Sequence, residues 1–388
     1  MDTQKLDQTY IANTYARFPV TIVKGKGSLV WDDTGKEYID LSTGIAVDIF
    51  GVADEEWMAA VTKQLGTLQH ISNLYYTEPC VKLAQMLCEK TGMKKVFFGN
   101  SGAEANECAI KAARKWSEEK KGKDYSTIIT LKNSFHGRTI TTLAATGQDV
   151  FHHDFTPLTE GFVYAEPNDL ADLEQLIKAN KCAAVMMEVV QGEGGVMPLD
   201  EAYVKGAAKL CEQYDLLLIC DEVQVGNGRS GKLYGYMHYG VQPDIVSTAK
   251  GLAGGLPLGA TLLGEKVQDV LSAGTHGSTF GGNPVCCAGA LSILHRLDGP
   301  LLQSVQEKSD FIVSSLTGAK GVKSVTGLGL MLGVETERPV KDVINDCMAR
   351  GVLVISAKNK VRLLPALNIP MAQLEQAVSV LKDVCAGE

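Results

Sequence analysis

The chain has 388 residues, which is too long for a single small hydrophobic core, so we expect a larger and a smaller lobe. Hydrophobic residues make up 45% of it and charged residues 21%, as in ordinary globular proteins, and a net charge of −8 leaves no basic surplus to bind nucleic acid. No apolar run reaches the roughly 18 residues of a membrane span, and the ten cysteines show no zinc-type spacing, which indicates a reduced cytoplasmic protein without a metal site.

Short strands are predicted first, at residues 20–23, 28–31 and 38–41. From about residue 50, helical stretches such as 105–116 and 203–214 alternate with apolar strands. Four apolar runs are continuous rather than alternating, as in strands buried on both faces of a parallel sheet, and they lie at 96–98, 127–131, 183–187 and 216–220.

This order of elements predicts an α/β fold whose ligands bind beyond the carboxyl ends of the strands. We expect residues 51–283 to form a large domain with a mainly parallel sheet and residues 284–388 to form a smaller α+β domain. Residues 1–50 are expected to contribute to the small domain.

Polar residues follow the first two apolar runs. Gly99–Asn106 is a small-residue turn that enters a helix, where free N–H groups and the helix dipole favour a phosphate, although an ordinary capped helix reads the same way. After the second run, Ser134–Arg138 offers a ring that could stack on a planar cofactor and a guanidinium, Arg138, that could hold a carboxylate. Taken alone, a core phenylalanine and a surface arginine are the better explanation of that segment.

Asp221 ends the fourth run, and a carboxylate at the end of a buried strand needs a cationic partner. A pyridinium nitrogen is such a partner, and an acid beside it keeps the ring protonated, so that the ring acts as an electron sink. Gln224, one helical turn later, could reach the phenolic oxygen of the same ring.

Lys250 follows another apolar strand and precedes a glycine-rich segment. Most lysines are surface charges, but a desolvated lysine near a cationic ring has a lowered pKa and can form an imine and move a proton.

Gly226–Gly231 fits the dinucleotide pattern G-x-G-x-x-G and, with Lys232, most of a phosphate-loop pattern. Leu233 replaces the hydroxyl that the second pattern needs, and a glycine-broken aromatic segment follows where the first pattern needs a helix. We therefore expect no nucleotide site in this loop.

Together these segments resemble the class III aminotransferases, which are fold-type I pyridoxal-phosphate enzymes. The resemblance runs over nearly the whole chain, from Asn13 to Pro365, and its motifs lie at 100–106, 135–139, 221–224, 249–251 and 277–284. Within the class, Ser72–Tyr76 and Gln191–Gly195 are most similar to the acetylornithine aminotransferases.

The resemblance implies that Lys250 carries pyridoxal 5′-phosphate as a Schiff base and that Asp221 pairs with its ring nitrogen. Thr279 is expected to reach the phosphate held by a partner subunit, which makes the protein a homodimer. The residues implied to contact the cofactor are Ser101, Gly102, Ala103, Phe135, His136, Asp221, Glu222, Gln224, Lys250 and Thr279.

The resemblance also implies two arginines for substrate carboxylates, Arg138 and Arg362, which suit a dicarboxylate such as 2-oxoglutarate. Glu193 is expected to neutralise Arg362 when a donor with one carboxylate binds. The implied substrate-binding residues are Arg138, Glu193, Arg362, Ser278, Asn73 and Tyr75.

The chain departs from the family pattern in two places. Gly51–Glu55 stands where a Gly-His-x-His-Pro segment is usual, and Val225 and Asn227 stand where a hydroxyl residue and a Met or larger residue are usual. Neither changes the cofactor residues, but both bear on the amino donor.

The expected reaction is amino transfer from the terminal nitrogen of N-acetylornithine to 2-oxoglutarate, a step of arginine biosynthesis. The sequence leaves open other ω-amino donors, namely succinylornithine, N-succinyl-diaminopimelate, ornithine and 4-aminobutyrate. An aminomutase or a non-enzymatic scaffold on the same fold is the remaining alternative.

Overall fold

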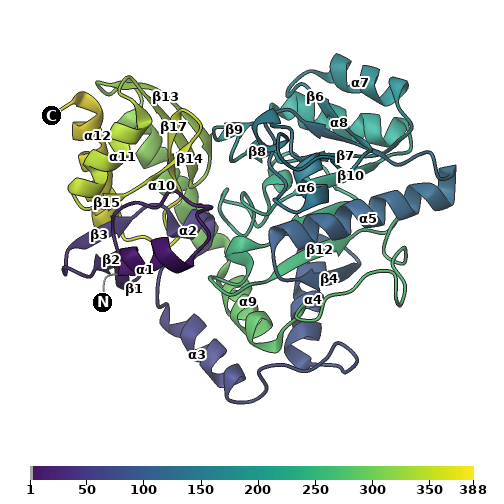
Figure 1. Ribbon diagram of the computed structural model, residues 1–388, viewed down its shortest axis with the longest axis horizontal. Helices are drawn as coiled ribbons and strands as arrows, with labels where there is room; N and C mark the ends of the chain where they lie inside the picture. Colours follow the sequence, from purple (N-terminus) through teal and green to yellow (C-terminus); the bar gives the residue numbers. More distant parts are fainter. Residues whose placement is uncertain (1–2) are drawn as a thin grey trace.

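The computed structural model describes residues 3–388, which form two lobes side by side (Figure 1). The larger lobe is built on a seven-stranded sheet with the order β4-β12-β11-β10-β7-β5-β6. Its strands are β4 (Lys95–Gly99), β5 (Thr127–Leu131), β6 (Phe162–Ala165), β7 (Cys182–Met187), β10 (Leu217–Asp221), β11 (Ile245–Thr248) and β12 (Gly259–Leu263). Six of these strands point in one direction and β12 points in the other, so the predicted α/β fold with a mainly parallel sheet is confirmed.

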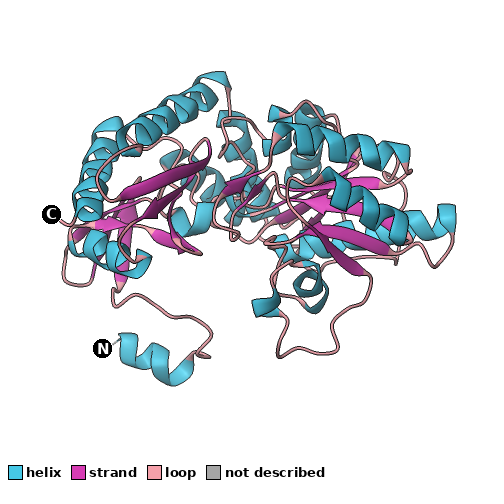
Figure 2. Ribbon diagram, turned by 90° about the horizontal axis from the view of Figure 1, so that it is seen from above, coloured by secondary structure: helices cyan, strands magenta, loops and turns pink. Residues whose placement is uncertain are grey.

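Helices cover both faces of this sheet, as Figure 2 shows. Alternate strand residues point to opposite sides: Ala184 and Met186 pack with α5 (Gly102–Lys121), and Val185 and Met187 pack with the helices of the other face. The other helices of the large lobe are α4 (Glu78–Thr91), α6 (Ile140–Ala145), α7 (Leu170–Ala179) and α8 (Glu201–Gln213). Burial on both faces explains the continuous apolar runs of the sequence.

The smaller lobe is formed by segments from both ends of the chain. The N-terminal strands β1 (Ile22–Lys26), β2 (Leu29–Asp32) and β3 (Glu37–Asp40) form a sheet that is completed by β15 (Val352–Leu353). A second sheet, in the order β13-β14-β17-β16, consists of β13 (Val322–Leu328), β14 (Met331–Thr336), β16 (Ile355–Ala357) and β17 (Lys360–Leu363). Its helices are α10 (Gly299–Leu316), α11 (Val340–Ala349) and α12 (Met371–Ala386).

The remaining elements are short or lie between the lobes. They are α1 (Thr3–Tyr10), α2 (Thr43–Ala46), α3 (Glu55–Leu65), α9 (Pro284–Arg296) and the two-stranded β8 (Val190–Gln191) and β9 (Met197–Pro198). The predicted domain boundary at residue 284 stays a prediction; α9, which begins there, packs against α3 and α4.

Three of the predicted elements are shifted or longer than the sequence suggested. The first strand begins at Ile22 and extends to Lys26, because it pairs with β2 up to Lys26 opposite Leu29, and Gly27 at φ +60° makes the turn. The predicted helix 105–116 continues on both sides as α5, from its cap at Ser101 to Lys121. The helix predicted at 203–214 spans Glu201–Gln213 as α8.

Candidate active site

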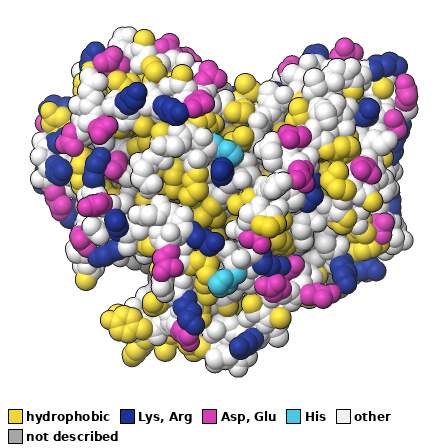
Figure 3. Space-filling model, turned by 180° about the vertical axis from the view of Figure 1, so that it is seen from behind, with side chains coloured by type: hydrophobic (Ala, Val, Ile, Leu, Met, Phe, Trp, Pro, Cys, Tyr) yellow, Lys and Arg dark blue, Asp and Glu magenta, His cyan; other side chains and the backbone are white. Residues whose placement is uncertain are grey.

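The candidate catalytic and binding residues that follow the strands lie at one edge of the large sheet. Strands β4, β5, β7, β10 and β11 all point the same way, and their carboxyl ends are followed by residues 100–103, 134–138, 188–193, 221–224 and 250. The parallel register places Asp221 beside Ser247, three residues before Lys250. This is the edge where open α/β sheets bind their ligands. Figure 3 shows the hollow that separates the two lobes.

Asp221 is buried and held from two sides. Its Oδ2 accepts a hydrogen bond from Nδ2 of Asn106 at 2.8 Å and lies 2.8 Å from Nδ1 of His136. Burial alone would lower the pKa of His136, but the hydrogen bond and charge of Asp221 outweigh it and raise that pKa. The Oδ1 atom accepts from the N–H of Val223 at 3.0 Å. A carboxylate fixed in this way is suited to face a protonated ring nitrogen.

Lys250 begins the short 3-10 turn Lys250–Leu252 with a positive φ of +46°. Burial lowers the pKa of its ammonium, while the negative charges of Glu193 and Asp221 oppose that shift. A lysine with a lowered pKa is a better nucleophile towards an aldehyde, because more of it is uncharged.

The turn after β4 ends at the N-terminus of α5. Ser101 is the N-cap and accepts from the N–H of Glu104 at 3.2 Å, which leaves the amides of Gly102 and Ala103 without a partner among residues 3–388. A Cβ on Gly102 would lie 2.6 Å from Cγ1 of Val223, so only glycine allows this close approach. Free amides at the positive end of a 20-residue helix form a cradle for a phosphate.

Phe135 and Arg138 follow β5. The N–H of Phe135 donates to Oε2 of Glu188 at 2.9 Å, and its ring meets that of Phe151 edge-on at 5.9 Å. Arg138 is exposed, its guanidinium lies 4.3 Å from the centroid of the Phe151 ring, and it forms no ion pair with any described residue. This guanidinium is free to bind a carboxylate.

Arg362, by contrast, is buried and already paired. Its Nη1 donates to Oε1 of Glu193 at 2.6 Å and to Oε1 of Gln224 at 3.0 Å. Although burial opposes the shift, the charge of Arg362 and its hydrogen bond lower the pKa of Glu193. Gln224 therefore serves the arginine pair in this structure, and its predicted contact with the cofactor oxygen stays a prediction.

Four predicted site residues lie in surface loops, and among residues 3–388 none of them forms a hydrogen bond with Lys250. Asn73 donates to the carbonyls of Ser278 and Gly281 at 3.0 and 2.9 Å, and Oγ of Ser278 accepts from Asn100 at 3.1 Å. Thr279 and Tyr75 are exposed. Their predicted roles stay predictions, and for Thr279 exposure is what a contact with a second subunit requires.

Glu222 has a structural role within the chain. Its two carboxylate oxygens accept from the backbone amides of Gly235 and Tyr236 at 2.7 and 2.8 Å, and burial raises its pKa to about 8. Both oxygens thus hold the loop that follows, and the predicted contact of Glu222 with the cofactor stays a prediction.

Sequence reasoning missed Asn106 and Glu188. Asn106 lies inside the motif at 100–106, but only the structure shows that its amide holds Asp221 and donates to the carbonyl of His136 at 2.7 Å. Glu188 directly follows the third apolar run; it accepts from Phe135 and from the N–H of Gly192 at 3.3 Å, and burial raises its pKa to about 7. A polar residue directly after a buried strand was the signal that could have revealed it.

The segment Gly51–Glu55, which departs from the family pattern, has a structural use. Asp54 caps α3 by accepting from the N–H of Trp57 at 2.9 Å, and it forms an ion pair with Arg296 at 2.8 Å.

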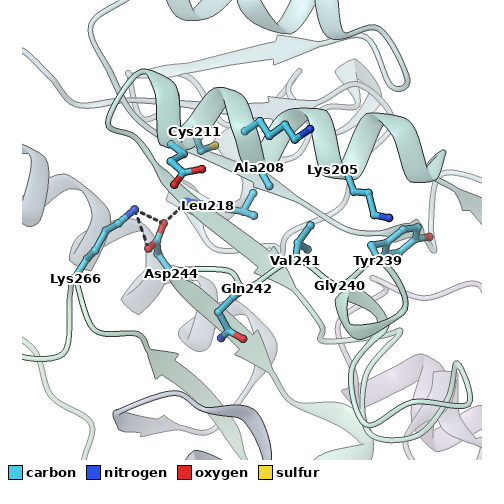
Figure 4. A pocket seen from close by; sticks show the side chains of 12 residues that line it. Lys205, Ala208, Cys211, Leu218, Tyr239, Gly240, Val241, Gln242, Asp244 and Lys266 are labelled. Carbon is cyan, nitrogen blue, oxygen red and sulfur yellow. Dashed lines mark hydrogen bonds and ion pairs between the residues drawn. The ribbon is translucent and has the colours of Figure 1, made fainter.

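A second hollow, of about 510 Å³, lies at the opposite edge of the large sheet (Figure 4). Asp244 and Lys266 in its wall are paired with each other at 3.1 Å, and Asp244 also accepts from the N–H of Leu218 at 3.0 Å. Because none of the predicted site residues lines this hollow, we place the candidate active site at the other edge.

Comparisons with known proteins agree with this geometry. The sequence matches the family described as aminotransferase class-III over residues 10–385. The chain belongs to the class-III aminotransferases. It is 51% identical to the acetylornithine aminotransferase of Haemophilus ducreyi, over 98% of each chain.

Solved structures give the same result. An ornithine aminotransferase from Toxoplasma gondii superposes with a TM-score of 0.95 at 32% identity, covering 99% of this chain and 94% of that one. The N-acetylornithine aminotransferase of Stenotrophomonas maltophilia superposes at 0.86 with 34% identity, covering 99% and 98%.

The predicted family and fold type, and the dependence on pyridoxal 5′-phosphate, are confirmed by these findings. An aminotransferase of this class uses a small amino donor and a keto acid. Among residues 3–388 no single helix is long and apolar enough to cross a membrane; α9 and α10 pass only as a pair, and they meet at a bend of 76°.

Proposed function

We propose that the protein transfers the terminal amino group of N-acetylornithine to 2-oxoglutarate, giving N-acetylglutamate 5-semialdehyde and glutamate for arginine biosynthesis. The observation that carries this proposal is the unequal state of the two arginines. Arg138 is exposed and has no ion pair among the described residues, whereas Arg362 is paired with Glu193. A donor with one carboxylate needs one arginine, and 2-oxoglutarate needs two.

The residues at the sheet edge fit pyridoxal 5′-phosphate. The free amides of Gly102 and Ala103 suit its phosphate, Asp221 suits its ring nitrogen, and Lys250 suits its aldehyde. When bound, the cofactor supplies an electron sink for the bond that breaks at the substrate carbon.

The residues of the chain perform the remaining work. Arg138 binds the donor's carboxylate and orients the terminal amino group towards the site. Lys250, whose pKa is lowered, would take a proton from the terminal carbon of the donor and pass it to the cofactor carbon that held the aldehyde. In the second half-reaction it would move a proton the opposite way, from that carbon to the keto carbon of 2-oxoglutarate. When 2-oxoglutarate binds, Glu193 releases Arg362, which binds the carboxylate next to the keto group.

The proposed enzyme is a homodimer that completes each site across the interface. Thr279 is exposed and follows Ser278, which lies against the phosphate turn through Asn100. Apolar side chains nearby are also uncovered: Leu74 is 87% exposed, Tyr76 is fully exposed and Phe280 is 59% exposed. Such a patch marks an association surface. Helix α1 buries none of its residues and stands away from the body of the chain (Figure 2).

A reducing cytoplasm suits the proposed enzyme, since all ten cysteines are free thiols. Cys286 and Cys287 are both buried in α9, and no disulfide forms among residues 3–388.

Two experiments test the proposal. Borohydride reduction with bound pyridoxal phosphate, followed by peptide mapping, is expected to label Lys250 and to leave Lys266, the control lysine of the second hollow, unlabelled. Label on another lysine would remove the catalytic assignment.

The second experiment is a donor panel assayed with and without 2-oxoglutarate. Acetylornithine should be the best donor among acetylornithine, succinylornithine, N-succinyl-diaminopimelate, ornithine and 4-aminobutyrate. Faster turnover of unacylated ornithine or of 4-aminobutyrate would contradict the assignment, and turnover without 2-oxoglutarate would point to an aminomutase.

A further inference from the structure

Asn227 lies at one of the two places where the chain departs from its family pattern, and its side chain contacts the end of the lysine strand. It is buried, and its Nδ2 donates to Oγ1 of Thr248 at 3.0 Å and to the carbonyl of Ala249 at 3.1 Å. A methionine at this position could make neither bond. We propose that Asn227 is a positioning residue for Lys250, and this inference rests on the proposed role of Lys250 as the cofactor lysine.

The carbonyl of Ala249 is the point through which Asn227 acts. The same oxygen accepts from the N–H of Leu252 at 2.9 Å, which closes the 3-10 turn that begins at Lys250. Since the peptide unit is planar, fixing this carbonyl also fixes the nitrogen of Lys250 and the direction in which its Cα enters the turn.

The backbone at this point needs such a restraint. Lys250 has φ +46°, a left-handed conformation that is unfavourable for a non-glycine residue and persists only where neighbours enforce it. Asn227 is itself left-handed at φ +56°, a conformation that asparagine tolerates better than most residues. The residue type therefore suits both the local backbone and the bond to Ala249.

The loop that carries Asn227 is anchored independently of the lysine strand. Arg229 is fully buried and donates to the carbonyls of Leu330, at 3.2 Å, and of Pro365, while its own carbonyl accepts from the N–H of Leu330 at 2.9 Å. Pro365 comes three residues after Arg362. The loop is thus held against the residue before β14 and against the segment that follows β17, the strand of Arg362, so Asn227 has a fixed position from which to restrain Lys250.

Two variants and one control isolate the effect. Asn227→Gly removes the amide but keeps the left-handed backbone at no cost, and Asn227→Asp keeps the shape but loses both N–H donors. The control is Val225→Thr, a change at the other departure from the family pattern. Val225 is also buried, and the substitution leaves the Asn227 bonds in place.

The test compares two ligands on the apoenzymes. Pyridoxal phosphate reports capture by Lys250, and pyridoxine 5′-phosphate, which lacks the aldehyde, reports binding by the rest of the pocket. We expect both Asn227 variants to form the lysine bond about tenfold more slowly, the worth of one or two buried hydrogen bonds, and to bind pyridoxine phosphate within about twofold of the wild type. Val225→Thr should match the wild type in both assays.

Two results would overturn the inference: an unchanged capture rate in both Asn227 variants, or an equal loss of capture rate and pyridoxine phosphate affinity. If one variant does not fold, the other decides. Failure of the wild type to form the bond at Lys250 would instead overturn the proposed function.

Discussion

The two arginines proposed to bind substrate occupy opposite physical environments. Arg138 is exposed, lies over aromatic rings and has no ion pair among the described residues, whereas Arg362 is 3% exposed and bound to Glu193 at 2.6 Å. A guanidinium without a partner can bind the carboxylate of either substrate. A paired guanidinium binds only a ligand that displaces its partner. One site can therefore accept substrates with either one or two carboxylates.

Replacing Arg138 is expected to have the largest effect, because both substrates use it. Arg138→Ala should reduce kcat/KM for acetylornithine and for 2-oxoglutarate by about a thousandfold each, the worth of a bidentate charged bond. Arg138→Lys, which keeps the charge but loses the fork, should recover part of the loss. Steady-state kinetics with each substrate varied would check this, and a loss confined to one substrate would break the comparison.

Replacing Arg362 should affect one substrate only. Arg362→Gln is expected to lower kcat/KM for 2-oxoglutarate about a hundredfold and that for acetylornithine by less than about tenfold, because the donor does not use this arginine. Single-turnover measurements of the two half-reactions separate the effects. Equal losses in both halves would mean that Arg362 supports the site in general.

Glu193→Gln tests whether the Glu193–Arg362 pair controls which substrate binds, and its effect on kcat/KM should be smaller. With the negative charge removed, the buried Arg362 faces the donor uncompensated, so kcat/KM for acetylornithine should fall about tenfold. The same variant should use 2-oxoglutarate at least as well as the wild type. Glu201→Gln, which removes an exposed pair with Lys205, is the matched control and should change neither value.

The smallest expected effect is on stability in acid. Because the pKa of Glu193 is lowered in the folded protein, its pair with Arg362 contributes stability above the unfolded pKa and loses it as the pH falls through the folded value. Thermal unfolding of the apoenzyme from pH 7 to 3 should therefore lose about 1 kcal/mol less in Glu193→Gln than in the wild type. Arg138→Ala should follow the wild-type curve, since Arg138 has no such partner.

The sequence predicted the residues whose chemistry is visible in a short motif. Asp221, Lys250 and Arg138 each follow a buried strand, and the structure brings the ends of those strands to one edge of the sheet. The pair between Glu193 and Arg362, 169 residues apart, was inferred from the family resemblance and is present in the structure.

The sequence could not reveal contacts between distant segments that no motif encodes. Asn106 holds Asp221 across 115 residues, and Asn227 reaches Ala249 across 22. The sequence also could not reveal that the carboxylate of Glu222 accepts from the amides of Gly235 and Tyr236. Asp221 and Glu222 are neighbours in the sequence, but their carboxylates bind different parts of the chain.

The most direct test is whether a dicarboxylate displaces Glu193 from Arg362. It needs two crystal structures of the cofactor-loaded enzyme, one with glutarate and one with a donor analogue that has a single carboxylate. We expect glutarate to bind both arginines and to displace Glu193 from Arg362, and the donor analogue to bind Arg138 and leave the Glu193–Arg362 pair intact. The same closed pair in both complexes, with glutarate bound away from Arg362, would contradict the account.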